Sequence, residues 1–185
     1  MNSALRDKIP SVEQCYTLLK RYHVPDHIIQ HSEMVCKVAV FLAEKLNSHG
    51  EHLIIPEIEA AALLHDITKM EGITTRQDHA ETGKELLHKH GLKRIGEIAL
   101  PISEEEIINY SDKRVMHTRV VTLPERFADL QKRYSFRGSD KNTIKRIIAL
   151  ESKTYELENK IFSKLDFIPE DLSSFIVPKN RSTDC

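Results

Sequence analysis

Apolar residues recur at intervals of three and four along most of this sequence, a spacing that places them on one face of a helix. The clearest case runs from Pro25 to about Asn47, where one stripe comprises Ile28, Val35, Val38, Ala39, Leu42 and Leu46. Glycine accounts for only 6 of the 185 residues, which argues against the turn-rich texture of a β-sandwich or barrel. The pattern predicts an all-α protein.

Local signals indicate where these helices begin and end. Ser11 with Gln14 and Ser103 with Glu106 have the spacing of a capping box, and Pro56 opens a further helix. We expect helices over 11–23, 25–47, 56–69, 79–90, 92–100, 103–116, 122–134 and 139–165. A chain of this length suits one domain, which we place at 11–165, after a lead over 1–10 and before a tail over 166–185.

Charge limits the classes of partner. A formal net charge of -1 excludes a generally basic protein that binds nucleic acid through its overall charge. One region is nevertheless basic: between Ser111 and Leu150, four acidic residues stand against Lys113, Arg114, Arg119, Arg126, Lys132, Arg133, Arg137, Lys141, Lys145 and Arg146. We favour a solvated helical face here over a surface that attracts phosphate.

The three cysteines, Cys15, Cys36 and Cys185, are far apart and form no CxxC pair, so they indicate neither a disulfide framework nor a cysteine zinc site. The first ten residues lack the apolar core of a signal peptide, and no apolar run is long enough to cross a bilayer. We therefore expect a cytoplasmic protein without a membrane partner.

Four polar residues fall on or beside apolar helix faces: His31, His65, Asp66 and Asp112. Buried histidines and carboxylates are costly unless they are paired, and one shared metal would pair all four. Adjacent His65 and Asp66 lie about 100° apart around a helix, so both reach one point at its edge. Two imidazoles and two carboxylates suit a catalytic divalent metal such as Mn, Co, Mg, Fe or Zn.

The sequence also resembles a known family. The run A-A-A-L-L-H-D-I-T-K at Ala60–Lys69, with His31 upstream and Asp112-Lys-Arg-Val downstream, resembles the HD superfamily of metal-dependent phosphohydrolases, in particular its small HDIG-type members. The likeness covers residues 8–165 and implies a single-domain HD-type helical bundle. It also implies that the same four residues bind the shared metal.

The activity that the resemblance implies is hydrolysis of a phosphoester in a small metabolite, in particular a nucleotide, by metal-activated water. Asp66 and Lys69 would then be catalytic. Lys69 and Arg114 would hold the phosphate, although each of them is equally well explained as a surface or structural cation.

His79 matches a histidine that some HD proteins use for a second metal. Those relatives carry a further histidine before the final aspartate, whereas Gly91 to Ser111 contains none and the stretch 96–106 is shortened. We therefore expect one metal ion, with His79 left to bind substrate or to cap a helix.

Other histidines carry less information. His23, His27 and His31 are spaced by four, but a zinc-protease pair requires glutamate where Ile28 stands. His117 either lines the pocket or is exposed.

Two alternatives to a hydrolase stay open. The first is a regulatory module that binds a nucleotide without turnover, which the shortened stretch before Asp112 suggests. The second, ranked last, is nucleic-acid binding through the basic face. A homodimer through the long final helix is a further expectation.

Overall fold

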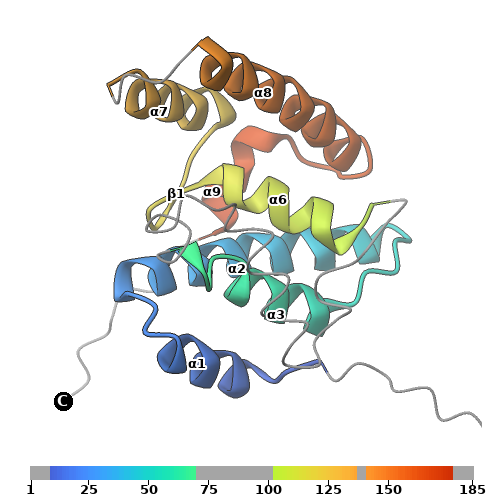
Figure 1. Ribbon diagram of the computed structural model, residues 1–185. Coiled ribbons are helices and arrows are strands. Elements are labelled where there is room, and N and C mark those ends of the chain that lie inside the picture. Colours follow the sequence, from blue (N-terminus) through green and yellow to red (C-terminus); the bar gives the residue numbers. More distant parts are fainter. Residues whose placement is uncertain (1–8, 70–101, 137–140, 177–185) are drawn as a thin grey trace, which may run out of the picture.

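The computed structural model describes residues 9–69, 102–136 and 141–176 (Figure 1). These residues form an all-α bundle with one minimal sheet, as the sequence predicted. The elements are α1 (Val12–Arg21), α2 (Asp26–Ser48), α3 (Ile55–Leu64), α6 (Glu104–Arg114), β1 (Val115–Met116), β2 (Arg119–Val120), α7 (Leu123–Phe136), α8 (Lys141–Phe162), the 3-10 helix η2 (Pro169–Asp171) and α9 (Leu172–Phe175).

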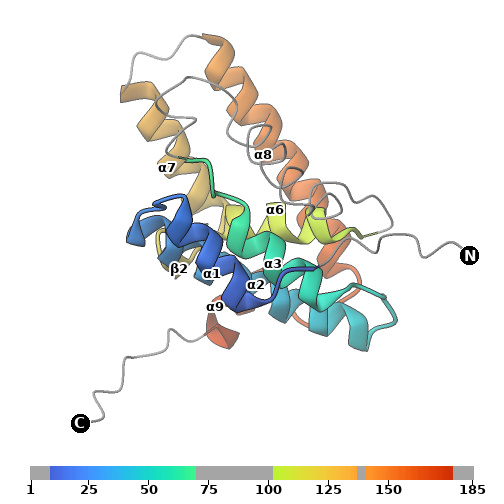
Figure 2. The ribbon, with the colours of Figure 1, turned by 60° about the horizontal axis from the view of Figure 1, so that its bottom comes forward.

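The central element is α2, which packs against both α3 and α6 (Figures 1 and 2). All six residues of its predicted apolar stripe are buried, which confirms that prediction. Full burial of one of them, such as Leu42, contributes about 1.5–3 kcal/mol of hydrophobic free energy. His31 is buried on the same helix, so the core positions it.

Both predicted capping boxes are present. In α1 the Ser11 hydroxyl accepts from the Gln14 amide at 3.3 Å, while the Gln14 side chain accepts from the Ser11 amide at 2.8 Å. In α6 the corresponding bonds between Ser103 and Glu106 are both 3.1 Å long. Each box satisfies two helix N–H groups that have no partner within the helix.

The hairpin of α7 and α8 lies on the far side of α6 from α2 and α3 (Figure 1). The chain then returns toward α2 through η2 and α9. Phe175 of α9 stacks on Phe41 of α2, with ring centroids 5.4 Å apart. The helix α6 thus lies between a layer formed by α2 and α3 and a layer formed by α7 and α8. The predicted site lies where α6 meets the first of these layers.

Two predicted helix ends are wrong. Val115 and Met116 were expected to continue α6, but they pair with Val120 and Arg119 in a two-stranded antiparallel sheet. The turn between the strands places His117 in the left-handed region, with φ 57°, which stops the helix. β-Branched Val115 and Val120 also favour extended backbone over helix.

The helix expected to reach Lys69 ends at Leu64, and Asp66 lies in the turn that follows. The helices predicted over 79–90 and 92–100 lie outside the described residues. Within the described part of the chain, no helix combines the length and the apolar character needed to span a membrane.

Candidate metal centre

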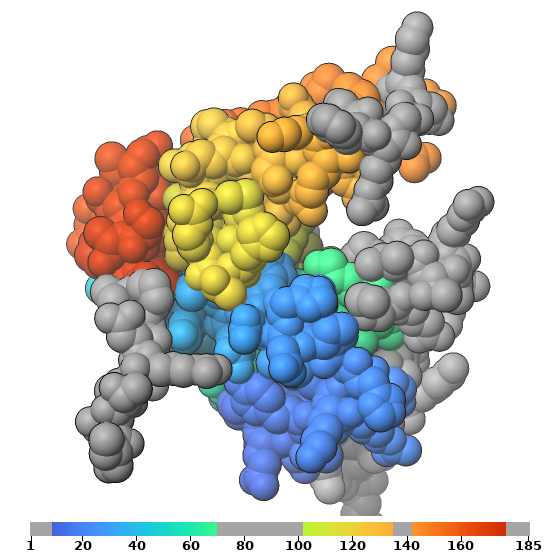
Figure 3. All heavy atoms as spheres, turned by 90° about the vertical axis from the view of Figure 1, so that its left-hand side faces the viewer, coloured from blue at the N-terminus to red at the C-terminus, as the bar shows by residue number. Residues whose placement is uncertain are grey.

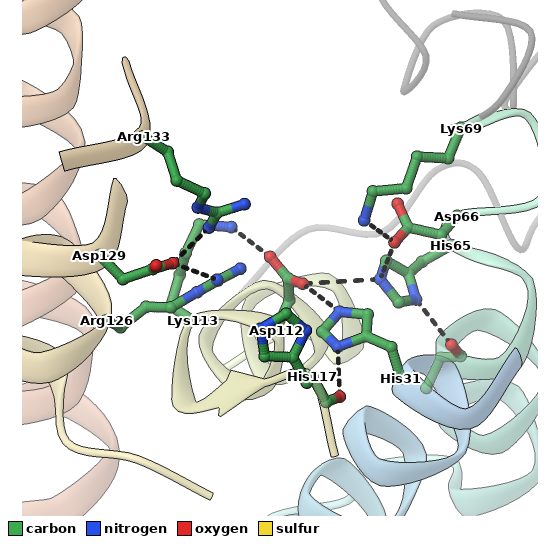
Figure 4. Close-up of polar contacts among 11 residues, drawn as sticks. His31, His65, Asp66, Lys69, Asp112, Lys113, His117, Arg126, Asp129 and Arg133 are labelled. Atoms are coloured by element: carbon green, nitrogen blue, oxygen red, sulfur yellow. Dashed lines mark hydrogen bonds and ion pairs between the residues drawn. The ribbon is translucent and has the colours of Figure 1, made fainter. Parts of the chain in front are cut away.

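Three segments that are distant in sequence bring the four predicted ligands together (Figure 4). Ligand atoms of His31, His65 and Asp66 all lie within 4.8 Å of one another. Asp112 joins them through Oδ1, which is 3.0 Å from His31 Nε2 and 3.7 Å from His65 Nε2. The four residues therefore form one cluster between α2, the end of α3 and α6. Their role as metal ligands stays a prediction.

A backbone carbonyl orients each imidazole. His31 Nδ1 donates to the carbonyl oxygen of His117 at 3.0 Å, and His65 Nδ1 donates to that of Ala62 at 2.8 Å. Because a carbonyl only accepts, the proton of each neutral ring is on Nδ1. Each Nε2 then faces the cluster, and this is how a metal-binding histidine is held by its second nitrogen.

The least satisfied atom of the cluster is Nε2 of His65. It is buried and has no hydrogen-bond partner among the residues that the structure describes. Its nearest carboxylate oxygens belong to Asp66 and Asp112, at 3.4 and 3.7 Å. An unpaired buried polar atom costs about 1–3 kcal/mol, and a cation shared with the carboxylates would remove that cost. The donor set therefore fits a divalent metal.

The charges of the cluster depend on one another. Burial by itself lowers the pKa of His65, but Asp112 and Asp66 outweigh burial and raise the pKa of His65 to about 10. Burial by itself raises the pKa of both aspartates, but His65 and the neighbouring lysines hold the pKa of each below its ordinary value. The metal-free cluster is therefore an imidazolium between two carboxylates, and a cation would compete with the proton on His65.

Each carboxylate of the cluster also contacts a lysine. Lys69 Nζ pairs with Oδ2 of Asp66, and Lys113 Nζ lies 2.5 Å from Oδ2 of Asp112. Both lysine side chains are partly exposed, at 32% and 19%. Lys69 thus lies where the sequence placed it, beside the cluster, whereas its catalytic role stays a prediction.

The structure corrects the prediction that Arg114 holds the phosphate, because the guanidinium of Arg114 is buried between α6, α8 and η2. Its Nε donates to the Val121 carbonyl and its Nη2 to the Pro169 carbonyl, both at 2.7 Å. Its Nη1 donates to Glu158 at 3.0 Å and to the hydroxyl of Tyr110. With these donors occupied inside the fold, Arg114 does not hold phosphate.

Sequence reasoning missed the contribution of His117, whose side chain is exposed while its backbone carbonyl orients His31. It also missed Arg126 and Arg133, which appeared only as members of a basic region and which lie near Lys113 (Figure 4). The spacing of seven between the two arginines was the available signal. His79 lies outside the described residues.

Comparison of the sequence with known protein families identifies the HD domain. The sequence profile of the HD domain matches residues 28–166. HD domains are generally metal-dependent, in agreement with the group formed by His31, His65 and Asp66. No solved structure matches the chain significantly.

Two relatives share the name tRNA (cytidine(56)-2'-O)-methyltransferase. The protein from Picrophilus torridus is 29% identical over 189 aligned positions, which cover 89% of this chain and 51% of the relative. The protein from Thermoplasma volcanium is 37% identical over 86 positions, which cover 45% of this chain and 23% of the relative. The chain thus spans about half the length of the first relative.

These names correct the predicted activity. From the resemblance we expected hydrolysis of a phosphoester, with a nucleotide-binding module as the alternative, but both relatives are named as enzymes of RNA methylation. The family and the names together point to an enzyme, though not to a phosphohydrolase.

Proposed function

Because this chain belongs to the HD domain family, we propose that it serves tRNA ribose methylation as a metal-binding module that holds the RNA by its phosphates. The observation that carries the proposal is the alignment with the Picrophilus torridus relative, which covers 89% of the chain. At that coverage the similarity extends over the bundle as a whole and is not limited to one motif.

The ion would be held by His31, His65, Asp66 and Asp112. Imidazole and carboxylate ligands together suit Mn, Fe, Co, Mg or Zn. When bound, such an ion supplies positive charge to the oxygens of a phosphate group.

The chain's own residues complete an anion site around these ligands. Lys113 neutralises Oδ2 of Asp112 and leaves Oδ1 directed at the two histidines, while Lys69 pairs with the Asp66 oxygen that also faces His65. Because both ammonium groups are partly exposed, a ligand arriving from solvent meets them first. This arrangement favours a phosphate group over a neutral ligand.

Holding the RNA is a distinct task from moving the methyl group. Methyl transfer to a ribose hydroxyl requires a methyl donor beside that hydroxyl, whereas the residues described around the cluster supply cations for phosphate. The chain spans about half the length of the Picrophilus torridus relative, so RNA binding and methyl transfer have room to be divided between two parts of such a protein. The proposal replaces the sequence-based ranking, which placed nucleic acid last.

The first test measures the metal content of the full chain and its affinity for tRNA. Elemental analysis is expected to find one divalent ion per chain, and an unmodified tRNA transcript is expected to bind about tenfold more weakly after chelation. His65→Ala should have the same effect as chelation. The matched control is His52→Ala, because His52 is exposed and lies between α2 and α3.

Absence of a divalent ion, or tRNA affinity that is unchanged by both chelation and His65→Ala, would overturn the proposal. Steady release of phosphate from the RNA would contradict it as well, since the module is proposed to hold RNA intact.

A second test asks about methylation directly. The aligned part of the Picrophilus torridus protein is replaced by this chain, and methylation of cytidine 56 is followed with a labelled methyl donor. The chimera is expected to methylate tRNA, and the same chimera carrying His65→Ala is expected to require a higher RNA concentration. If the chimera and its His65→Ala variant require the same RNA concentration for methylation, the proposal is contradicted.

A further inference from the structure

Three cations lie together beside the metal centre, outside the site that the sequence predicted. Lys113 comes from α6, and Arg126 and Arg133 come from one face of α7 (Figure 4). They lie on one side of Asp112, whereas Lys69 lies on the other. Lys113, Arg126 and Arg133 are called the α7 cation group below.

Among the described residues, the two arginines share one counter-charge, the carboxylate of Asp129. Oδ2 of Asp129 is 2.6 Å from Arg133 Nη2 but 3.8 Å from Arg126 Nη1, which is longer than a hydrogen bond. Nε of Arg126 is buried and has no hydrogen-bond partner among the described residues. Only 12% of the Arg126 side chain is exposed. Such a guanidinium is costly to bury, and an acceptor from a ligand would offset that cost.

The balance of charge around the cluster favours a ligand with more than one phosphate. In the described part of the chain, four cations, Lys69 and the α7 cation group, lie beside three carboxylates, which are Asp66, Asp112 and Asp129. A divalent ion would increase this positive excess. Figure 4 places Lys69 on one side of Asp112 and the α7 cation group on the other, an arrangement that suits a ligand with phosphates on both sides.

The surface shape agrees with an extended ligand. In the space-filling view the coloured surface is hollowed between α7 and the end of α3 (Figure 3). In the close-up Arg126 and Arg133 of α7 lie on one side of the cluster, and Lys69, which follows the turn after α3, lies on the other (Figure 4). A strand of linked phosphates lying along this hollow would pass the metal centre and the arginines in turn.

We infer that the α7 cation group is a second phosphate site, which binds a phosphodiester of the same RNA strand that the metal centre holds. The RNA identity of the ligand rests on the proposed function, whereas the phosphate chemistry rests on the arginines themselves. A guanidinium binds two phosphate oxygens at once, and Asp129 keeps Arg133 oriented for this contact.

The test uses the full chain loaded with its metal and a fluorescently labelled, unmodified tRNA transcript, titrated at several salt concentrations. Arg133→Ala and Arg126→Gln are each expected to weaken binding about fivefold to tenfold and to reduce the log–log salt slope by about 0.7–0.9. The matched control is Lys132→Ala, which removes one exposed positive charge from the same helix. Its side chain points about 100° away from that of Arg133, so we expect less than about a twofold change.

The variants separate this inference from simpler explanations. Arg133 is half exposed, at 51%, so its replacement leaves the fold intact, and the melting temperature checks Arg126→Gln. An equal loss of affinity in Lys132→Ala would mean that bulk charge is responsible and would overturn the inference. So would tRNA binding that depends on His65 but on neither arginine, although the proposed function would then stand.

Failure of the proposed function has its own signature, which is a chain that binds no tRNA even with metal present. The same variants are then titrated with inorganic pyrophosphate. Weaker pyrophosphate binding in both arginine variants would support the phosphate site with a smaller ligand as its source. Equal pyrophosphate binding in all variants would overturn the inference.

Discussion

Asp112 and Arg114 lie two residues apart on α6, yet they belong to two different polar regions. Around Arg114 the donors are paired: carbonyls of Val121 and Pro169 accept from Nε and Nη2, and Glu158 accepts from Nη1. The hydroxyl of Tyr110 donates to Glu158 at 2.5 Å and closes the network. A buried polar network that is complete in itself stabilises the fold and leaves nothing for a ligand.

The region around Asp112 is incomplete. Within residues 9–69, 102–136 and 141–176, Nε2 of His65 has no hydrogen-bond partner. Asp112 and Asp66 raise the pKa of His65 to about 10, so the metal-free cluster holds an imidazolium between two carboxylates. Under-satisfied polar groups at the meeting point of three segments are the expected signature of a ligand site. The comparison teaches that hydrogen-bond completeness, more than burial or charge, separates the structural region from the functional one.

The largest effect that tests this comparison is expected from Arg114→Ala. Removing the guanidinium takes from the half-buried Glu158 its charged partner, leaves it only the Tyr110 hydroxyl, and frees two carbonyls. The free energy of unfolding should therefore fall by about 3–5 kcal/mol. Denaturant titration of both proteins measures this difference in the free energy of unfolding. Metal affinity of the folded fraction should not change. A loss below about 1 kcal/mol would mean that the closed network is not structural.

The converse variant is His65→Ala. Because the cluster loses a ligand, the dissociation constant for the divalent ion should rise about 100-fold, equivalent to about 2.7 kcal/mol of binding free energy. Isothermal calorimetry provides the measurement, with His52→Ala as the control. If metal affinity survives in His65→Ala, the incomplete region is not a metal site.

A smaller effect is expected when the stability of the metal-free protein is measured as a function of pH. The pKa of His65 is raised to about 10, so its contribution to stability is full below the unfolded pKa of about 6.5 and is lost as the pH rises toward 10. Thermal melts with a chelator present should show this alkaline decline, and His65→Ala should abolish it. The arginine network predicts no such decline, because arginine stays charged throughout.

The smallest effect is expected from Ser103→Ala, at the start of the helix that both regions share. Loss of the capping box should cost about 1 kcal/mol of stability. It should leave the metal dissociation constant unchanged, because the cap lies two turns or more from Asp112. Ser11→Ala in α1 is the matched variant and should lose a similar amount by the same denaturant titration. Unequal losses would indicate that α6 has a special role in the fold.

Several features were predictable because they depend on neighbouring residues. The capping boxes of α1 and α6 and the buried stripe of α2 follow from spacings of three and four, and the structure confirms them. The end of α6 was not predictable in this way. The apolar period continues through Val115 and Met116, and only pairing with β2 turns these residues into a strand.

The activity shows a different limit. The motif residues indicated the HD family correctly, but the step from family to phosphohydrolysis failed, because one metal-binding bundle supports more than one use. Under the proposed function, these uses differ in the groups around the cluster, here the cations of α7, which no sequence motif marks.

By itself, the sequence determined the helical class, the helix starts and the four residues that form the cluster, since these follow from local spacing and a recognisable motif. Lys113 and Arg114 are adjacent and equally charged, and only the tertiary structure decided which of them lies beside the cluster and which is buried in the fold. Successive side chains of a helix point about 100° apart. Lys113 therefore meets Asp112 beside the metal centre, while Arg114 meets partners 44 and 55 positions away in sequence and is buried.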